Sequence, residues 1–325
     1  MIGVVAPLNV YGPYPCLELR FPKLEDVPVW NFAVDTGASL NTIQNKFKEK
    51  YEFHQIEGLP RTTMAAGMGG EFSPGDLVIL GDAALAGLPV EQRDVVFIRN
   101  LMAIASPRAS PTDGILGSSF CSMFLGGVEF DWYGTDANPP TFCFYFSHDT
   151  TSLSYTKGMT RIPMRHVFGL YTVTIAVNGN EIIALLDTGS SITILNEKTA
   201  QKLGIRISDT KSVENPMTLK IQDLPHLQVG GIDGRPMEVA RSLSKVSVDI
   251  GGISLGQGNL YVATIPVFSI MENVAKDNKV TAPSAILGLD FLKRTHRMIV
   301  IGKDPCELWV EELTKSDIKH KSHKK

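Results

Sequence analysis

The sequence predicts an all-β protein built from two copies of one unit. Three features recur in the same order in both halves of the 325-residue chain. An Asp-Thr-Gly triplet stands between two apolar runs, a glycine-rich segment follows, and an Ile-Leu-Gly triplet comes later. Apolar runs on both sides of a sharp turn are typical of two buried strands. The length suits two domains of ordinary size better than a single core.

The composition indicates a globular protein with no strong field. Hydrophobic residues make up 43% of the chain and charged residues 20%. The net charge of −3 gives no reason to expect a nucleic acid or an anionic membrane as partner. We see no apolar run long enough to span a bilayer, no signal-peptide pattern and no N-x-Ser/Thr sequon, which favours a cytoplasmic location. The four cysteines lie far apart without a C-x-x-C pair, so neither a zinc site nor another cofactor is expected.

The first copy begins with alternating apolar residues over 16–34, which predict a β-hairpin leading into Asp35. The polar stretch after Ile43 predicts a short surface helix. The glycine cluster Ala65–Gly70 predicts a mobile hairpin tip, because glycine readily adopts the positive φ values that such tips require. Further strands are expected at residues 77–80, 94–98, 128–132 and 141–146, and Ile-Leu-Gly occupies residues 115–117.

The second copy follows a polar, turn-rich linker at residues 147–160. Asn178-Gly179 is a strong hairpin signal, and the strand after it runs into Asp187. Asn196 is expected to cap a helix that ends at Gly204. A glycine-rich tip at residues 229–234, strands at 246–250, 260–265, 298–301 and 307–311, and Ile-Leu-Gly at 286–288 complete the copy.

Insertions have stretched the second copy, because its Ile-Leu-Gly triplet lies further from Asp-Thr-Gly than in the first copy. Long insertions are expected at residues 99–112 in the first copy and at residues 266–284 in the second. We predict two domains, residues 1–150 with Asp35 and residues 151–325 with Asp187, the second ending in a basic tail from about residue 313 to residue 325.

Asp35 and Asp187 are expected to form one site. Equivalent residues of two copies that pack about a pseudo-two-fold axis meet at that axis. Two carboxylates in contact cannot both be ionised near neutrality, so they share a proton. Such a pair can hold a water molecule, with one carboxylate acting as general base and the other as general acid.

The residues beside the two aspartates have predicted supporting roles. Thr36 and Thr188 are expected to form hydrogen bonds across the axis and brace the two turns. Gly37 and Gly189 permit the turns and present backbone N–H groups to the carboxylates. Ile-Leu of each later triplet is expected to pack under the turns, with its glycine allowing close approach.

One position differs between the copies. Ala38 follows the first Asp-Thr-Gly, and Ser190 follows the second. A serine hydroxyl donated to Asp187 would favour its charged form, so the sequence predicts that Asp187 is ionised more readily than Asp35.

The glycine-rich tips are candidates for flaps that fold over an extended peptide and exclude water. The flap candidates are Met68, Gly69, Gly70, Gly231, Ile232 and Asp233.

The paired Asp-Thr-Gly and Ile-Leu-Gly motifs resemble those of aspartic peptidases, most closely a tandem of two retropepsin-like domains. The resemblance covers most of residues 15–312. It implies two closed-barrel-like lobes about a pseudo-two-fold axis, endopeptidase activity on polypeptides, and Asp35 and Asp187 as the catalytic pair. It also implies a monomer with an internal pseudo-dimer. No tyrosine occurs between Tyr51 and Tyr133, where a pepsin-like flap normally carries one, so the retropepsin-like description fits better.

Two other readings stay open at this stage. A catalytically silent scaffold of the same fold would bind peptides or protein partners without cleaving them. An assembly module would pair its halves with other chains instead of with each other. The retention of aspartate at both sites argues for the enzyme, because a silent site does not need two paired acids.

Overall fold

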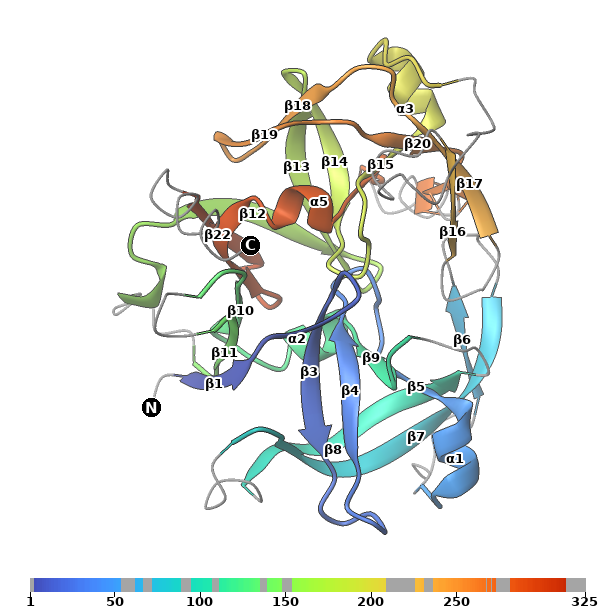
Figure 1. The fold of residues 1–325 in the computed structure, drawn as a ribbon, viewed down its shortest axis with the longest axis vertical. Coiled ribbons are helices and arrows are strands. Elements are labelled where there is room, and N and C mark those ends of the chain that lie inside the picture. The colour runs from blue at the N-terminus through green and yellow to red at the C-terminus, as the bar shows by residue number, and fades with distance from the viewer. Residues whose placement is uncertain are drawn as a thin grey trace.

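Strands form most of the regular structure of the chain, and the helices are short. The computed structural model describes residues 3–53, 62–66, 72–88, 95–106, 111–134, 139–147, 154–208, 226–230, 236–266, 268–269, 271–272 and 281–313. The predicted all-β fold with two lobes is confirmed, and the lobes lie at the top and bottom of the view in Figure 1.

The first half forms an eight-stranded sheet in the order β2-β3-β4-β9-β5-β8-β7-β6. An additional pairing of β3 with β7 brings this sheet back to its own beginning. Its elements are β2 (Asn9–Tyr11), β3 (Tyr14–Arg20), β4 (Val29–Val34), β5 (Thr42–Gln44), α1 (Asn45–Lys50), β6 (Thr62–Ala66), β7 (Phe72–Leu85), β8 (Val96–Ser106), β9 (Gly114–Leu116) and α2 (Ser118–Cys121). The predicted hairpin into Asp35 is β3 and β4, and the predicted surface helix is α1.

The second half repeats this arrangement with two interruptions. Its elements are β13 (Leu170–Val177), β14 (Asn180–Leu186), β15 (Ile194–Asn196), α3 (Glu197–Lys202), β16 (His226–Gly230), β17 (Pro236–Arg241), β18 (Val246–Ile250), β19 (Ile253–Gly258), β20 (Tyr261–Ala263), β21 (Ala285–Leu287) and α5 (Leu289–Leu292). Where the first half has the long strand β7, the second has two shorter consecutive strands, β17 and β18, and where the first half has β8, the second has β19 and β20. Asn178 and Gly179 both have positive φ in the turn between β13 and β14, as the hairpin signal predicts.

The two halves share a sheet. Strands β1 (Gly3–Pro7), β10 (Gly127–Asp131) and β11 (Thr141–Tyr145) come from the first half, and β12 (Thr160–Val167), β22 (Thr295–Ile301) and β23 (Glu307–Glu312) from the second. They run in the order β1-β11-β10-β22-β23-β12, on the left in Figure 1. The order is symmetric about its centre, because β10, β11 and β1 on one side correspond to β22, β23 and β12 on the other. The pseudo-two-fold axis therefore passes between β10 and β22.

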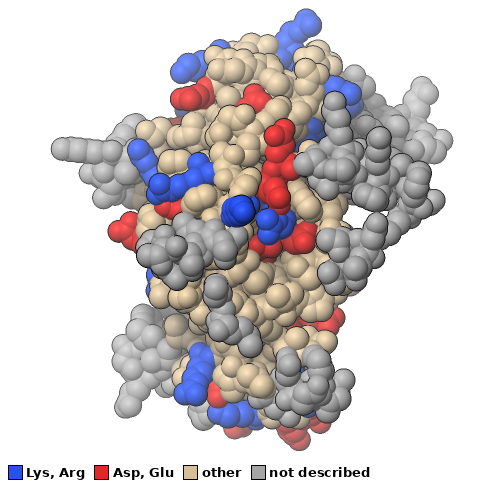
Figure 2. Space-filling model, turned by 90° about the vertical axis from the view of Figure 1, so that its left-hand side faces the viewer, with Lys and Arg blue, Asp and Glu red and all other residues tan. Residues whose placement is uncertain are grey.

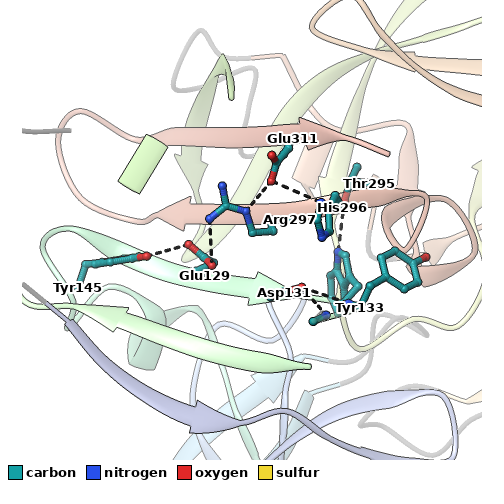
Figure 3. A network of polar contacts seen from close by, with 10 residues as sticks. Glu129, Asp131, Tyr133, Tyr145, Thr295, His296, Arg297 and Glu311 are labelled. Carbon is teal, nitrogen blue, oxygen red and sulfur yellow. Dashed lines mark hydrogen bonds and ion pairs between the residues drawn. The ribbon is translucent and has the colours of Figure 1, made fainter. Parts of the chain in front are cut away.

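A partly buried ionic network crosses this joint between β10 and β22 (Figure 3). The Glu129 carboxylate accepts a hydrogen bond from the Tyr145 hydroxyl at 2.8 Å and lies 3.5 Å from the Arg297 guanidinium. Arg297 also donates from Nε to Glu311 at 2.5 Å, and His296 lies 3.7 Å from the same carboxylate. Burial raises the pKa of Glu129, so Arg297 holds a poorly solvated acid in place between the halves.

One detail of the second half differs from the prediction. Asn196 occupies the N-cap position of α3, but its side chain makes no capping hydrogen bond. Asn196 is also the last residue of β15 and is 8% exposed, so strand pairing with Ala263 decides where its side chain lies. Gly204, with φ of +67°, follows the end of the helix as predicted.

The face of the molecule on which the shared sheet lies carries charges of both signs. Figure 2 shows Lys and Arg interspersed with Asp and Glu on this face, among the residues that are described. No helix in the described part of the chain has both the length and the apolar character that a membrane crossing would need.

Candidate active site

The two aspartates end equivalent strands at the centre of the molecule. In the first half β4 pairs in parallel with β9, and the N–H of Asp35 donates to the carbonyl of Leu116 at 2.9 Å. In the second half β14 pairs in parallel with β21, and the N–H of Asp187 donates to the carbonyl of Leu287 at 3.0 Å. Each Ile-Leu-Gly segment therefore supports the turn of its own half, as expected from the sequence.

The turns are joined across the axis by Thr36 and Thr188, both fully buried. The Thr36 hydroxyl donates to the carbonyl of Leu186 at 2.7 Å, and the Thr188 hydroxyl donates to that of Val34 at 2.6 Å. Each hydroxyl also accepts the backbone N–H of the other threonine, at 3.0 and 3.1 Å. Four hydrogen bonds thus fix one aspartate-bearing strand against the other.

The glycines of the two triplets allow the carboxyl groups to approach. A Cβ atom added to Gly37 would overlap the carboxyl group of Asp187, and one added to Gly189 would overlap that of Asp35. The N–H of Gly37 donates to Asp35 Oδ1 at 2.8 Å, and that of Gly189 donates to Asp187 Oδ1 at 2.8 Å. Any side chain at either glycine would therefore force the carboxyl groups apart.

The carboxyl groups of Asp35 and Asp187 form one titrating pair. They are hydrogen-bonded to each other and surrounded by protein, yet each aspartate keeps part of its surface exposed to solvent. Burial raises the pKa of Asp35, and burial together with the charge of Asp35 raises the pKa of Asp187 well above its ordinary value. The pair therefore shares one proton over a wide pH range.

The contact from which this asymmetry was predicted is not formed. The Ser190 hydroxyl donates its only proton to the carbonyl of Ile192 at 2.7 Å, so it cannot donate to Asp187. Backbone N–H groups lower the pKa of both aspartates, those of Gly37, Ala38 and Gly189 at Asp35 and those of Gly189 and Ser190 at Asp187.

Two polar residues that the sequence analysis missed hold the Ile-Leu-Gly glycines. The N–H of Gly117 donates to Asn41 Oδ1 at 2.9 Å, and the N–H of Gly288 donates to Thr193 Oγ1 at 3.0 Å. Both partners lie six residues after the aspartate of their half, which is a signal that alignment of the two copies could have found. The Thr193 hydroxyl donates in turn to Asp290 at 2.6 Å. Asp290 therefore holds in place the hydroxyl that accepts the Gly288 N–H.

Tyr14 is a further residue beside the pair. Burial and the charges of Asp35 and Asp187 raise its pKa, so its hydroxyl lies within electrostatic reach of both carboxylates. The predicted flap residues Met68, Gly69, Gly70, Gly231, Ile232 and Asp233 lie outside the described residues. Hairpins β6–β7 and β16–β17, which bear these tips, lie on the same side of the molecule, at the right in Figure 1.

Comparison with known families agrees with this geometry. A family model described as aspartyl protease matches residues 22–120 and 173–240, which is more than half of the chain. The chain belongs to the aspartyl protease family. The two matched segments of this aspartyl protease contain one Asp-Thr-Gly triplet each, which confirms the resemblance inferred from the sequence.

Solved structures and curated proteins were also compared. A retropepsin-like aspartic protease from Rickettsia conorii is 19% identical, with 47% of this chain and 90% of that chain covered and a TM-score of 0.28. EIAV protease in complex with the inhibitor HBY-793 is 20% identical, with 38% and 84% covered and a TM-score of 0.24. None of the curated proteins matches the chain.

Proposed function

We propose that this aspartyl protease family member is an active aspartic endopeptidase, in which Asp35 and Asp187 activate one water molecule. The observation that carries the proposal is the pairing of two hydrogen-bonded carboxyl groups, each partly open to solvent, at the axis between two equivalent half-sites. A single ordinary turn aspartate would have neither the partner nor the raised pKa.

In this proposal Asp35 starts ionised and Asp187 starts protonated, because burial and the charge of Asp35 raise the pKa of Asp187. Ionised Asp35 accepts a proton from the water as general base, and the water oxygen attacks the carbonyl carbon of the peptide bond. Protonated Asp187 donates its proton to the carbonyl oxygen as general acid. The tetrahedral gem-diol intermediate then breaks at the C–N bond: the nitrogen receives the proton held by Asp35, and one hydroxyl of the intermediate returns its proton to Asp187, which restores the starting state of the pair. A carboxylic acid and an amine leave.

The supporting residues keep this geometry fixed. Thr36 and Thr188 prevent one carboxyl group from moving relative to the other, and Gly37 and Gly189 keep the space between them free. The two domains of the proposal are residues 1–150 and 151–325, with a polypeptide substrate bound between them. The tips beyond β6 and β16 are proposed to cover the substrate.

A peptide-library digestion tests this function. Wild-type protein is incubated with a diverse peptide library at several values between about pH 4 and pH 8, and new termini are identified by mass spectrometry. Asp35→Asn and Asp187→Asn should each abolish the new termini, while circular dichroism shows that both variants remain folded. Asp249→Asn, on β18, is the matched control and should retain full activity.

The outcomes separate the enzyme from the silent scaffold. Cleavage that survives either substitution at the pair would contradict the shared mechanism. If wild-type protein cleaves nothing but binds library peptides, the chain is a peptide-binding scaffold and the proposal is wrong.

A further inference from the structure

The strand registers define which side chains share a face with each aspartate. Successive side chains of a strand point to opposite faces of the sheet. Leu185, two residues before Asp187, therefore lies on the same face as Asp187. Ile286 is the register partner of Leu185 on β21, and Leu170 of β13 lies opposite Asp187 when the β13–β14 register is continued. Leu170, Leu185 and Ile286 therefore form the wall beside Asp187.

The same rule gives the wall beside Asp35. Ala33 lies two residues before Asp35, and Ile115 is its register partner on β9. Tyr14 of β3 lies opposite Asp35 when the β3–β4 register is continued. Position by position, Tyr14, Ala33 and Ile115 are the counterparts of Leu170, Leu185 and Ile286.

The wall beside Asp187 is covered by the long insertion. Leu170, Leu185 and Ile286 are 8%, 5% and 1% exposed, and they pack in one cluster with Phe268 and Met271. Phe268 is fully buried and Met271 is 7% exposed. Both belong to the connection over residues 264–284 that joins β20 to β21.

Phe268 and Met271 also pack toward the β16–β17 hairpin. Their cluster includes Ile194 of β15 and Val239 of β17. In Figure 1 the short orange segment between β15 and β17 belongs to this connection. Phe268 and Met271 thus lie between the wall beside Asp187 and the β16–β17 hairpin.

The wall beside Asp35 is more open. Residues 107–113 make a much shorter connection from β8 to β9 than residues 264–284 make in the second half. Tyr14 and Ile115 each keep part of their surface exposed, and Ala33 is smaller than its counterpart Leu185. Among the described residues, Tyr14 and Ile115 are therefore less covered than their counterparts Leu170 and Ile286.

The backbones at Tyr14 and Leu170 are held alike, so the difference lies in the side chains and the insertion. Lys293, the residue after α5, donates to the carbonyl of Pro13 at 2.8 Å, just before Tyr14. Ser118 of α2 donates to the carbonyl of Gly169, just before Leu170. Each hairpin is thus held by a residue in or next to the short helix of the opposite half.

We propose that the insertion makes the substrate cleft one-sided, with one small and one large subsite next to the cleaved bond. Phe268 and Met271 fill the subsite beside Asp187, so that it accepts only a small residue. The subsite beside Asp35 takes a large residue, which packs against Tyr14. This inference rests on the proposed endopeptidase function and names its substrates. They are polypeptides with Gly, Ala or Ser on one side of the cleaved bond and a bulky residue on the other. Tyr14 remains a protonated hydroxyl, which adds a hydrogen-bond donor to the large subsite.

A positional peptide library measures this preference directly. Each of the two positions flanking the cleaved bond is varied, and kcat/KM is determined for every residue. We expect one position to accept Gly, Ala or Ser and to reject Leu and Phe by tenfold or more, and the other position to show the reverse order. A change of one or a few methylene groups in a pocket typically alters kcat/KM by about 10- to 200-fold.

Variants assign the two positions to the two halves. Met271→Ala should raise kcat/KM for Leu at the small position by about tenfold. Phe268→Leu, a smaller change at the fully buried residue, should act in the same direction. Met164→Ala is the matched control, because Met164 is 6% exposed but packs in the main core. Tyr14→Phe should alter the ranking of residues only at the large position. Thermal unfolding confirms that each variant is folded at the assay temperature.

The results distinguish this inference from the function on which it rests. If wild-type protein cleaves peptides but tolerates bulky residues equally at both positions, the one-sided cleft is wrong and the endopeptidase function stands. The same holds if Met164→Ala changes the preference as much as Met271→Ala. No cleavage by wild-type protein would overturn both.

Discussion

The Thr36 and Thr188 hydroxyl groups each accept the backbone N–H of the other residue across the pseudo-two-fold axis, at 3.1 and 3.0 Å. Each hydroxyl also donates to a carbonyl of the opposite half, so neither half can shift without leaving buried polar groups unpaired. The position of one aspartate relative to the other is therefore set by these two residues.

Replacing either threonine should damage both stability and activity. Thr36→Val or Thr188→Val leaves a buried N–H and a buried carbonyl unpaired, which should cost about 1–3 kcal/mol in the free energy of unfolding. The misplaced pair should lower kcat by about 10²-fold. Thr172→Val is the matched control, because the buried Thr172 donates at 3.3 Å to Arg165 within its own half. Equal kcat values for all three variants would contradict the bracing role.

The pH dependence of kcat/KM should be bell-shaped. In the proposed mechanism one aspartate of the pair is ionised and the other protonated, so activity is lost as the pH falls through the lower apparent pKa of the pair and as it rises through the upper one. Because burial raises the pKa of both residues, the acidic limb should lie above 3.8, the ordinary aspartate value. Glu129→Gln, far from the pair on β10, should not move the profile. An acidic limb at or below 3.8 would show that Asp35 is not shifted as described.

The Ser190 hydroxyl should have no part in this titration. Since it donates to the carbonyl of Ile192, Ser190→Ala should leave the acidic limb in place and cost about 1 kcal/mol of stability. The opposite change, Ala38→Ser, tests the equivalent position in the first half. A shift of the acidic limb in Ser190→Ala, measured by kcat/KM against pH, would restore the original prediction from the sequence.

The joint between β10 and β22 should depend on Arg297. Arg297→Met leaves the side chain of Glu129, 7% exposed, without its cation, and because Arg297 itself is 25% exposed we expect a loss of about 2 kcal/mol. The pKa of Glu129 is raised in the folded state, so its ionisation lowers the free energy of unfolding as the pH rises. The loss caused by Arg297→Met should therefore be larger at pH 7, where Glu129 is ionised, than at pH 4, where Glu129 is protonated. Urea unfolding at both values measures it. Arg297→Met combined with Glu129→Gln should recover part of the loss, and no recovery would contradict the ionic explanation.

The repeated triplets made the centre of the molecule predictable. Asp35 and Asp187 follow apolar strands, and each Ile-Leu segment pairs beside its aspartate, because these are local patterns of buried strands. The shared sheet was not predictable in the same way. The pairing of Val128 with Val300 joins segments far apart in the chain, and periodicity carries no information about which strands become neighbours.

The errors arose where several partners competed for one side chain. The Ser190 hydroxyl could reach either a carboxylate or a carbonyl, and the turn places the carbonyl of Ile192 at 2.7 Å. Asn196 could cap a helix or end a strand, and the strand prevailed. Tyr14 was missed because its place beside Asp35 follows only from the register of a hairpin, which composition and spacing do not fix.

The shared pair within one chain is tested most directly by kcat/KM for Asp35→Asn and Asp187→Asn on one cleaved peptide, each alone and in an equimolar mixture. We predict that each variant loses at least about 10³-fold and that the mixture recovers no activity, because both aspartates of a site belong to the same chain. Activity of either variant near the wild-type level, or recovery of activity in the mixture, would contradict a pair formed by Asp35 and Asp187 of one molecule.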